Sequence, residues 1–334
     1  NIENEKIHWA QIVSDRWNLG GEYKVLNSEF DFNFELIQPD DRKFIVKIMR
    51  EDCEKSFLDA QVSILEFLRK DGSELPIPKI IKSVSGNNYE LAADLNNDER
   101  IIWVLDKIEG IMLSEVSPIS KNLMLDLGKK VASLDLASKK FTIDIYPPSN
   151  KWDLTKPLWI RDSVPKILDP ELEIIINEIL DDFLRISDRL NYLPHYWIHN
   201  DLNDQNLLVG VLSNGQTVLS GILDFGDLSK SPTICNVAIC SAYLLILPGI
   251  GLNLQLEFLR GYHSINPISE EELDILFALI VTRLAVSYVN SSMISKDKPY
   301  DPYVIISQKD SKNFLMDMTK SQKYFTSRFR DICE

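Results

Sequence analysis

The spacing of apolar residues changes near residue 108, and this change limits the folds open to the chain. Before it, residues 23–27, 33–38 and 43–49 are predicted to form short strands, with the turn 39–42 between the last two. After it, apolar residues recur at helical spacing over long stretches. A strand-rich part followed by a mostly helical part is typical of an α+β protein and not of a doubly wound sheet.

Both parts contain further predicted elements. In the first, a helix over 52–70 follows the third strand, and strands near 88–92 and 100–107 precede the boundary. The second part is predicted to hold helices at 122–139, 171–190, 234–247, 252–262, 270–292 and 309–329. We therefore expect a bilobal chain, with an antiparallel-sheet N-terminal lobe over 1–108 and a mostly helical C-terminal lobe over 109–334.

The composition is that of an ordinary globular protein with enough length for two lobes. The 334 residues are 45% hydrophobic and 26% charged, and the formal net charge is −14. An acidic chain without a basic patch repels a phosphate backbone, so we expect no nucleic-acid partner. The same acidity suits a cationic substrate, although excess carboxylates also serve solubility.

The chain carries no sign of secretion, of a membrane span or of a metal-binding cysteine motif. Its four cysteines have no CxxC spacing, which argues against a zinc site and a disulfide framework. The first residues contain no basic and apolar leader. The apolar stretch 232–252 is interrupted by polar residues and a Pro-Gly break, so we interpret it as a buried helix. A cytoplasmic protein without a membrane partner is the prediction.

Two segments hold the residues best suited to chemistry: HNDLNDQN, residues 199–206, and LDFGD, residues 223–227. A carboxylate such as Asp201 can accept the proton of a hydroxyl nucleophile during phosphoryl transfer. Asn206 offers an amide oxygen to one Mg²⁺, and Asp224 offers carboxylate oxygens to Mg²⁺ that bridges nucleotide phosphates. Each residue alone is more often a cap or turn residue. Their ordered combination predicts a kinase.

A lysine in the third predicted strand extends this pattern. Lys47 lies within FIVKIM, where a charge among β-formers is unexpected unless it faces a cleft. We expect Lys47 to hold the α- and β-phosphates of the nucleotide, oriented by a carboxylate from the helix 52–70. Asp59 is the first choice for that carboxylate, with Glu54 and Glu66 as alternatives.

Other nucleotide contacts are predicted by position only. The turn from Ser28 to Phe32 lies between the first two strands, where main-chain amides and the Ser28 hydroxyl would meet phosphates. This turn contains no glycine. The segment from Asp106 to Ile108 is predicted to be the hinge whose main chain meets the purine base.

At these residues the sequence resembles the aminoglycoside phosphotransferase-like kinases, and most closely the hydroxylysine kinase group. The similarity extends over nearly the whole chain. It includes LNSEFDFNFEL, FIVKI, LDAQ, LGKKVASLD, HNDLNDQNLLV, GILDFGDL, ICNVAICSAYLL and GYHSINPISEEELDILFALIVTRLAVS. The resemblance implies a protein-kinase-like fold and ATP- or GTP-dependent phosphorylation of a small amino-alcohol. It implies the catalytic role for Asp201, metal roles for Asn206 and Asp224, the phosphate role for Lys47 and the helix-carboxylate role for Asp59.

The sequence also departs from the family pattern. Asn200 stands where the family commonly has glycine, and Asp59 is one methylene shorter than the usual glutamate. The residues after LDFGD lead into a helix without a long activation segment, which disfavours a protein-kinase function.

Three functional hypotheses remain open on sequence alone. The first is a kinase acting on an amino-alcohol such as 5-hydroxylysine, and the second is a kinase for an aminoglycoside, choline or homoserine-like acceptor. The third is a catalytically silent binding protein, which the intact motif residues oppose. Candidates for contact with a small cationic, hydroxyl-bearing substrate are Asp227, Asp204, Glu115 and Arg283, although a surface or capping role suits each of them equally well.

Overall fold

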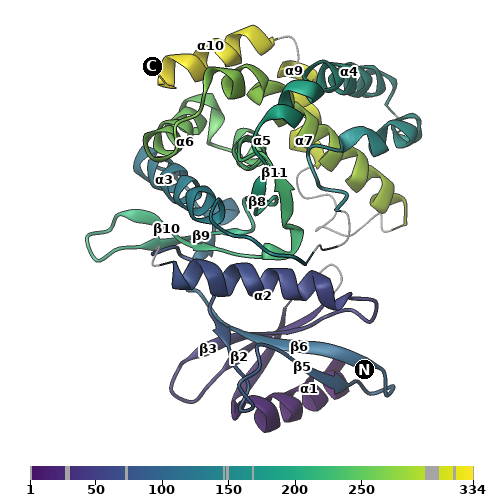
Figure 1. The fold of residues 1–334 in the computed structure, drawn as a ribbon, viewed down its shortest axis with the longest axis vertical. Helices are drawn as coiled ribbons and strands as arrows, with labels where there is room; N and C mark the ends of the chain where they lie inside the picture. The colour runs from purple at the N-terminus through teal and green to yellow at the C-terminus, as the bar shows by residue number, and fades with distance from the viewer. Residues whose placement is uncertain are drawn as a thin grey trace. The chain divides into compact units, whose positions relative to one another are not determined.

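The computed structural model describes residues 2–26, 31–71, 74–145, 147, 150–167, 169–297, 308–318 and 321–333. The chain divides into two compact units. Unit 1 comprises Asn1–Glu109 with Ile143–Pro148, and unit 2 comprises Gly110–Thr142 with Ser149–Glu334. Unit 1 is built on an antiparallel sheet and unit 2 is mostly helical (Figure 1). This confirms the predicted α+β class.

The described residues of unit 1 form one six-stranded antiparallel sheet and two helices. The strands run in the order β1-β2-β3-β6-β4, and β5 pairs with β6. The elements are α1 (Ile2–Trp17), β1 (Glu22–Leu26), β2 (Phe32–Ile37), β3 (Lys43–Ile48), α2 (Lys55–Lys70), β4 (Ile80–Ile81), β5 (Glu90–Ala93) and β6 (Glu99–Asp106). Figure 1 shows α1 on one side of this sheet and α2 on the other.

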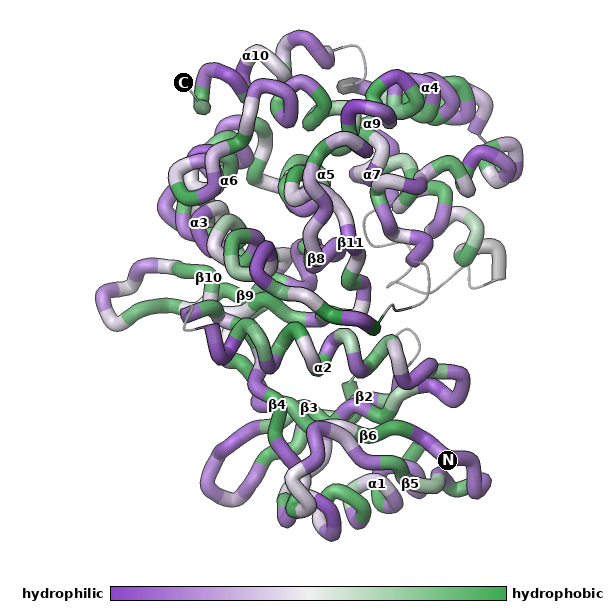
Figure 2. Tube along the Cα trace, viewed as in Figure 1, coloured by the Kyte–Doolittle hydropathy of each residue, from purple (hydrophilic) through white to green (hydrophobic). Residues whose placement is uncertain are grey.

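The register of the sheet decides which residues of β3 face α1. Val46 lies opposite Phe34 of β2 and Val104 of β6, and all three side chains are buried in a core that includes Trp9 and Trp17 of α1. Since side chains alternate along a strand, Lys47 lies on the face away from this core. Along α2, apolar residues recur turn by turn (Figure 2), as expected for a helix with one buried face.

Unit 2 combines helices with short β-ladders. The helices in its described part are α3 (Lys121–Ser138), α4 (Pro170–Tyr192), α5 (Ile234–Ile246), α6 (Gly251–Ile265), α7 (Glu270–Asp297), α9 (Gln308–Met318) and α10 (Gln322–Cys333), with 3₁₀ helices at Leu113–Glu115, Pro157–Lys166 and Phe225–Asp227. Its strands are β7 (Ile111–Met112), β8 (Tyr196–Ile198), β9 (Leu207–Val211), β10 (Thr217–Ile222) and β11 (Ser229–Ser231). The ladders run β10-β9-β7 and β11-β8, all antiparallel.

Helices α3 and α6 pack so closely that two positions leave no room for a side chain. A Cβ on Gly128 of α3 would lie 2.0 Å from the carbonyl oxygen of Phe258, and a Cβ on Gly261 of α6 would lie 2.2 Å from that of Leu125. Main-chain atoms cannot move aside as a flexible side chain can. The two glycines therefore allow the helix backbones to meet.

Two predictions about helices have a definite outcome. The apolar stretch 232–252 contains α5, whose residues 234–244 are all buried. None of the helices in the described part of the chain has the length and apolar character that crossing a membrane requires. The single helix predicted over 309–329 is instead two helices, α9 and α10, with residues 319–320 between them outside the described part.

Candidate active site

The loop from His199 to Asn206 connects β8 to β9, and the β9–β10 hairpin returns the chain to it. The main-chain N–H of Leu223 donates to the carbonyl of Asn206 at 2.8 Å. This hydrogen bond places Asp224 next to the end of the loop. The antiparallel pairing of β9 with β10 thus brings together Asn206 and Asp224, which are eighteen residues apart in the sequence.

His199 links the two motifs through hydrogen bonds of its ring. Its Nε2 lies 2.8 Å from the carbonyl of Leu223, and its Nδ1 lies 3.2 Å from the main-chain nitrogen of Asp201. Since a carbonyl only accepts and an N–H only donates, the ring is neutral with its proton on Nε2. Burial lowers the pKa of His199 to about 4, which keeps it neutral at physiological pH. Its ring also packs edge-on against Phe225, with centroids 4.6 Å apart.

Asp201 is held by donors on both carboxylate oxygens. Oδ2 accepts from the amides of Asn203 at 3.1 Å and Asn206 at 2.9 Å. Oδ1 accepts from the guanidinium of Arg283 at 2.8 Å. Burial raises the pKa of Asp201, and the Arg283 cation opposes that rise. The arrangement presents an oriented carboxylate of the kind that a proton acceptor requires.

Asn206 and Asp224 have the donor atoms that a divalent cation prefers. The Asn206 amide nitrogen donates to the carbonyl and to Oδ2 of Asp201, both at 2.9 Å, so its amide oxygen faces away from these partners. Asp224 adopts a left-handed conformation with φ 57°, and its Oδ1 accepts from the N–H of Gly226 at 3.1 Å. Its charge raises the pKa of Asp201. Neighbouring carboxylates beside an amide oxygen that faces away from Asp201 fit a Mg²⁺ site.

Asp227 belongs to the same acidic group. Burial, followed by the charges of Asp201 and Asp224, raises its pKa to about 7. The side-chain amide of Asn150 donates to its carboxylate at 2.7 Å and to its carbonyl at 3.1 Å. These bonds attach the segment that follows residue 149 to the Asp224 turn. Asp227 is thus next to the proposed metal position, where a substrate contact was predicted.

The other substrate candidates lie in different settings. Asp204 has its carbonyl, not its carboxylate, in contact with the N–H of Ser114 at 3.3 Å, and burial raises the pKa of its carboxyl group. Glu115 is exposed at the end of a 3₁₀ turn. Arg283 is 1% exposed and bonded to Asp201, so the prediction that it contacts substrate is not supported.

In unit 1, the predicted pair of Lys47 and Asp59 is not formed. The carboxylate of Asp59 accepts a hydrogen bond from the Tyr89 hydroxyl at 2.7 Å. The alternatives are also engaged elsewhere, Glu54 with Ser56 and Glu66 with Lys70. Within the described ranges, Lys47 makes no ion pair, and its ammonium lies 5.8 Å from the centre of the Trp103 ring. Tyr89 directly precedes β5, and its bond to Asp59 of α2 joins residues that are 30 positions apart, which the sequence pattern does not reveal.

In the predicted hinge, Asp106 already makes hydrogen bonds within unit 1. The N–H of Asp106 donates to the carbonyl of Lys79 at 2.9 Å, and its carboxylate accepts from the N–H of Lys79. Asp106 therefore holds β6 to the chain before β4. Ile108 follows the strand, and its N–H has no acceptor among the residues described. Ser28 falls within residues 27–30, which lie outside the described part of the chain.

The profile of the phosphotransferase enzyme family matches residues 22–273, which is most of the chain. The chain belongs to this family. Both motifs of the site, HNDLNDQN and LDFGD, lie inside the matched range. This family membership makes the protein a small-molecule kinase, as its motifs predicted.

Known proteins similar to this phosphotransferase cover most of its length. A hydroxylysine kinase of Danio rerio is 24% identical over 322 residues, which are 92% of this chain and 86% of that protein. A hydroxylysine kinase of Xenopus laevis is 27% identical over 267 residues, 74% of this chain and 70% of that protein. Among solved structures, an amicoumacin kinase in complex with AMP-PNP, Ca²⁺ and Ami superposes with a TM-score of 0.71 at 14% identity, covering 94% of each chain. This structural similarity confirms the predicted kinase-like fold.

Several residues of the phosphotransferase site were missed from the sequence. Asn150 lacks any pattern that distinguishes it from a turn residue, and Asn203 lies within HNDLNDQN but was given no role. Asn236 lies in an apolar helix, and its side-chain oxygen accepts from the N–H of Asn200 at 2.9 Å. Arg283 was noticed but given a different role. A single cation inside the apolar run FALIVTRLAV was the available signal, since a buried charge needs a partner.

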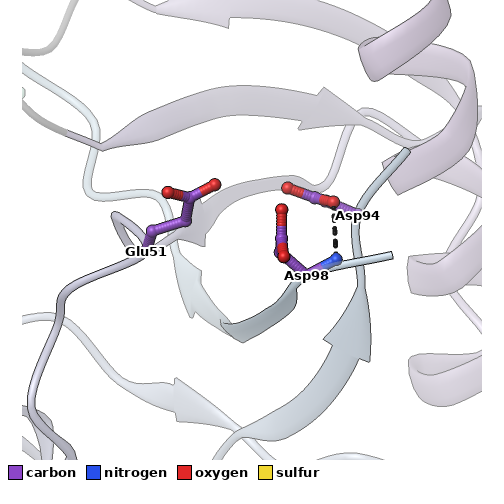
Figure 3. A group of neighbouring side chains, drawn as sticks. All are labelled: Glu51, Asp94 and Asp98. Atoms are coloured by element: carbon purple, nitrogen blue, oxygen red, sulfur yellow. Dashed lines mark hydrogen bonds between the residues drawn. The ribbon is translucent and has the colours of Figure 1, made fainter. Parts of the chain in front are cut away.

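Unit 1 of the phosphotransferase also has a cluster of acidic side chains, Glu51, Asp94 and Asp98 (Figure 3). The Asp94 carboxylate accepts from the main-chain N–H groups of Asn96 at 2.8 Å and Asp98 at 3.0 Å, and it pairs with Arg100 at 3.4 Å. Its bonds stabilise the turn between β5 and β6. We assign this cluster a structural role.

Proposed function

We propose that this phosphotransferase moves the terminal phosphoryl group of ATP or GTP to the hydroxyl of an amino-alcohol, with 5-hydroxylysine as the leading acceptor. The observation that carries the proposal is the convergence of Asp201, Asn206 and Asp224 on one short loop and the hairpin that returns to it. An oriented carboxylate beside two metal-binding side chains is what transfer to a hydroxyl requires.

Asp201 accepts the proton of the acceptor hydroxyl as the new P–O bond forms and the bond between the terminal phosphorus and the bridging oxygen breaks, which releases ADP or GDP. Its carboxylate is already oriented by Asn203 and Asn206 on one oxygen and by Arg283 on the other. Asn206 and Asp224 would hold Mg²⁺, which would neutralise charge on the nucleotide phosphates. His199 keeps the two motifs in fixed register through its bonds to Leu223 and Asp201. Because these groups are pre-positioned, little reorganisation is needed at the moment of transfer.

In unit 1 we assign nucleotide binding to Lys47, to the N–H of Ile108 and to the turn that begins at Ser28. Lys47 supports this role because its ammonium has no carboxylate partner in the described ranges, so a phosphate is a suitable counter-charge. Asp59 is the proposed partner of Lys47 in the nucleotide complex, which requires release of its bond to Tyr89.

The acceptor class is supported by charge and by the named relatives. Asp227 lies beside the metal position, and its carboxylate is partly protonated at neutral pH because its pKa is about 7. An ammonium group would restore its ionised form and gain an ion pair. Asp204 is a second candidate for this contact. The relatives with high coverage are hydroxylysine kinases. Acceptors of the aminoglycoside, choline or homoserine type are the alternative.

The test is a nucleotide-consumption screen of the purified chain over hydroxylated amines, with ATP and GTP in parallel and Mg²⁺ present. We expect turnover with 5-hydroxylysine and none with lysine, which lacks the hydroxyl. N-acetylation of the accepted amine should lower kcat/KM, and Asp227→Asn should raise KM more than it lowers kcat. If no hydroxylated amine causes the protein to consume ATP or GTP, the kinase proposal fails and the hypothesis of a catalytically silent binding protein remains.

We also propose a cytoplasmic location for the enzyme.

A further inference from the structure

Arg283 is a buried cation with a donor for each of three partners. It lies in α7 and is 1% exposed. Its Nε donates to the Tyr243 hydroxyl at 3.3 Å, and one terminal nitrogen donates to the carbonyl of Trp152 at 3.2 Å. The other terminal nitrogen donates to Oδ1 of Asp201 at 2.8 Å. A guanidinium has a rigid planar fork, so these three bonds fix its orientation.

Two aromatic rings also pack against the guanidinium of Arg283. Its central carbon lies 4.6 Å from the centre of the Trp152 ring and 5.5 Å from that of Tyr243. The turn that carries Trp152 is itself fixed, because Asp153 accepts from the N–H and hydroxyl of Thr155 and from Ser231. Arg283 therefore rests on a rigid support that is independent of Asp201.

The orientation of an aspartate carboxylate is otherwise soft, since its terminal torsion has broad minima. Of the two carboxylate oxygens of Asp201, the side chains of Asn203 and Asn206 contact only Oδ2, so these bonds alone leave Oδ1 without a restraint. Arg283 approaches Oδ1 from the other side. Donors on both oxygens prevent rotation of the carboxylate about its Cβ–Cγ bond.

We propose that Arg283 is the positioning residue that fixes the carboxylate of Asp201 for proton acceptance. This inference rests on the proposed function, because it requires Asp201 to be the base. Arg283 acts through Asp201 and does not bind the acceptor: its three directed bonds are satisfied within the protein, and it has almost no exposed surface. Loss of Arg283 thus reduces kcat and leaves acceptor KM nearly unchanged.

A double-mutant cycle tests this role. Asp201→Asn alone should lower kcat by roughly 10²–10⁴-fold, and Arg283→Met alone by about 10²-fold, the scale of a misplaced catalytic group. In the Asp201→Asn background, Arg283→Met should cause no further loss, because the group it positions is gone. Arg283→Lys should lose less than Arg283→Met, since it keeps the charge but not the fork. Acceptor KM should stay within about threefold in each case.

The controls separate a catalytic loss from a folding defect. Arg260→Met removes an arginine of α6 whose only ion-pair partner in the described chain is Glu257, at 3.8 Å, and should leave kcat unchanged. Calorimetric titration with Mg-nucleotide and the thermal unfolding midpoint show whether each variant is folded, independently of its activity. If Arg283→Met does not fold, Arg283→Lys in both backgrounds supplies the same cycle.

Two results would overturn the role of Arg283: wild-type kcat in the Arg283 variants, or losses that multiply in the double variant. A near-normal kcat in Asp201→Asn would instead refute the base itself, and with it the proposed mechanism. The two failures are therefore distinguishable.

Discussion

The main-chain N–H of Asn200 donates to the side-chain oxygen of Asn236, 2.9 Å away, at the residue just before Asp201. The Asn236 amide in turn donates to Oδ1 of Asp135 at 2.6 Å, and the Tyr262 hydroxyl donates to Oδ2 at 2.6 Å. All four residues are buried. The catalytic loop is thus fastened to α5, α3 and α6 by an internal chain of hydrogen bonds.

The conformation of Asn200 leads to a prediction about stability. Its φ is 67°, in the left-handed region, and both polar atoms of its buried side chain lack a hydrogen-bond partner among the described residues. Glycine removes both costs, although it adds backbone entropy to the unfolded state. We expect Asn200→Gly to be at least as stable as the natural protein and Asn200→Ala to be less stable, by about 1 kcal/mol, because alanine tolerates this region poorly. Urea unfolding of the three proteins checks the order, and a more stable alanine variant would contradict it.

Asp135 predicts a pH dependence of stability. Burial raises its pKa from 3.8 to about 7, so the folded state binds its proton more strongly than the unfolded state does. The stabilisation from this bound proton is therefore complete below pH 3.8 and is lost as pH rises to about 7. Between these values the free energy of unfolding falls by about 1.4 kcal/mol for each pH unit. In Asp135→Asn the part of the slope that this carboxyl group contributes should disappear.

The measurement is the free energy of unfolding of both proteins between pH 4 and 8. His199 acts in the opposite direction, since its lowered pKa removes stability as pH falls below 6.5. Because both proteins contain His199, its effect cancels in their difference. Parallel stability curves for the natural protein and Asp135→Asn would refute the assignment.

Asp224 predicts a loss of metal-dependent nucleotide binding. Asp224→Ala removes the carboxylate proposed to hold Mg²⁺, and a triphosphate beside Asp201 and Asp227 is then electrostatically unfavourable. We expect calorimetry to show no Mg-dependent nucleotide binding in this variant. Asp317→Ala, at an exposed position of α9, is the matched control and should bind normally. Unchanged Mg-nucleotide affinity in Asp224→Ala would exclude the metal role.

The close contact of α3 with α6 predicts that Gly128→Ala is strongly destabilising. The added methyl would lie 2.0 Å from the carbonyl oxygen of Phe258, so the two helices must separate. Overpacking of this kind costs about 1–3 kcal/mol or more. Gly20→Ala is the control, because a Cβ there meets nothing within 4 Å. Differential scanning calorimetry should show a lower midpoint for Gly128→Ala only, and equal midpoints would show that the helices can shift.

Much of this protein was predictable from the sequence because the relevant signals are local. The periodicity of apolar residues predicted the sheet, the helix α2 and the helical second part, since each pattern depends on neighbours a few residues away. The spacing within HNDLNDQN and LDFGD predicted Asp201, Asn206 and Asp224 as one group, because a short loop and a hairpin bring them together.

The partners of these residues were decided by tertiary structure. Arg283 is 82 residues from Asp201, and Asn236 is 101 residues from Asp135. Asp59 contacts Tyr89 and not Lys47. Such contacts depend on how helices and strands pack, and no local pattern encodes which side chain will face a given carboxylate. The sequence by itself determined which chemical groups the site contains, and the packing of α3, α5 and α7 determined how those groups are held, because only packing brings distant side chains within hydrogen-bond distance.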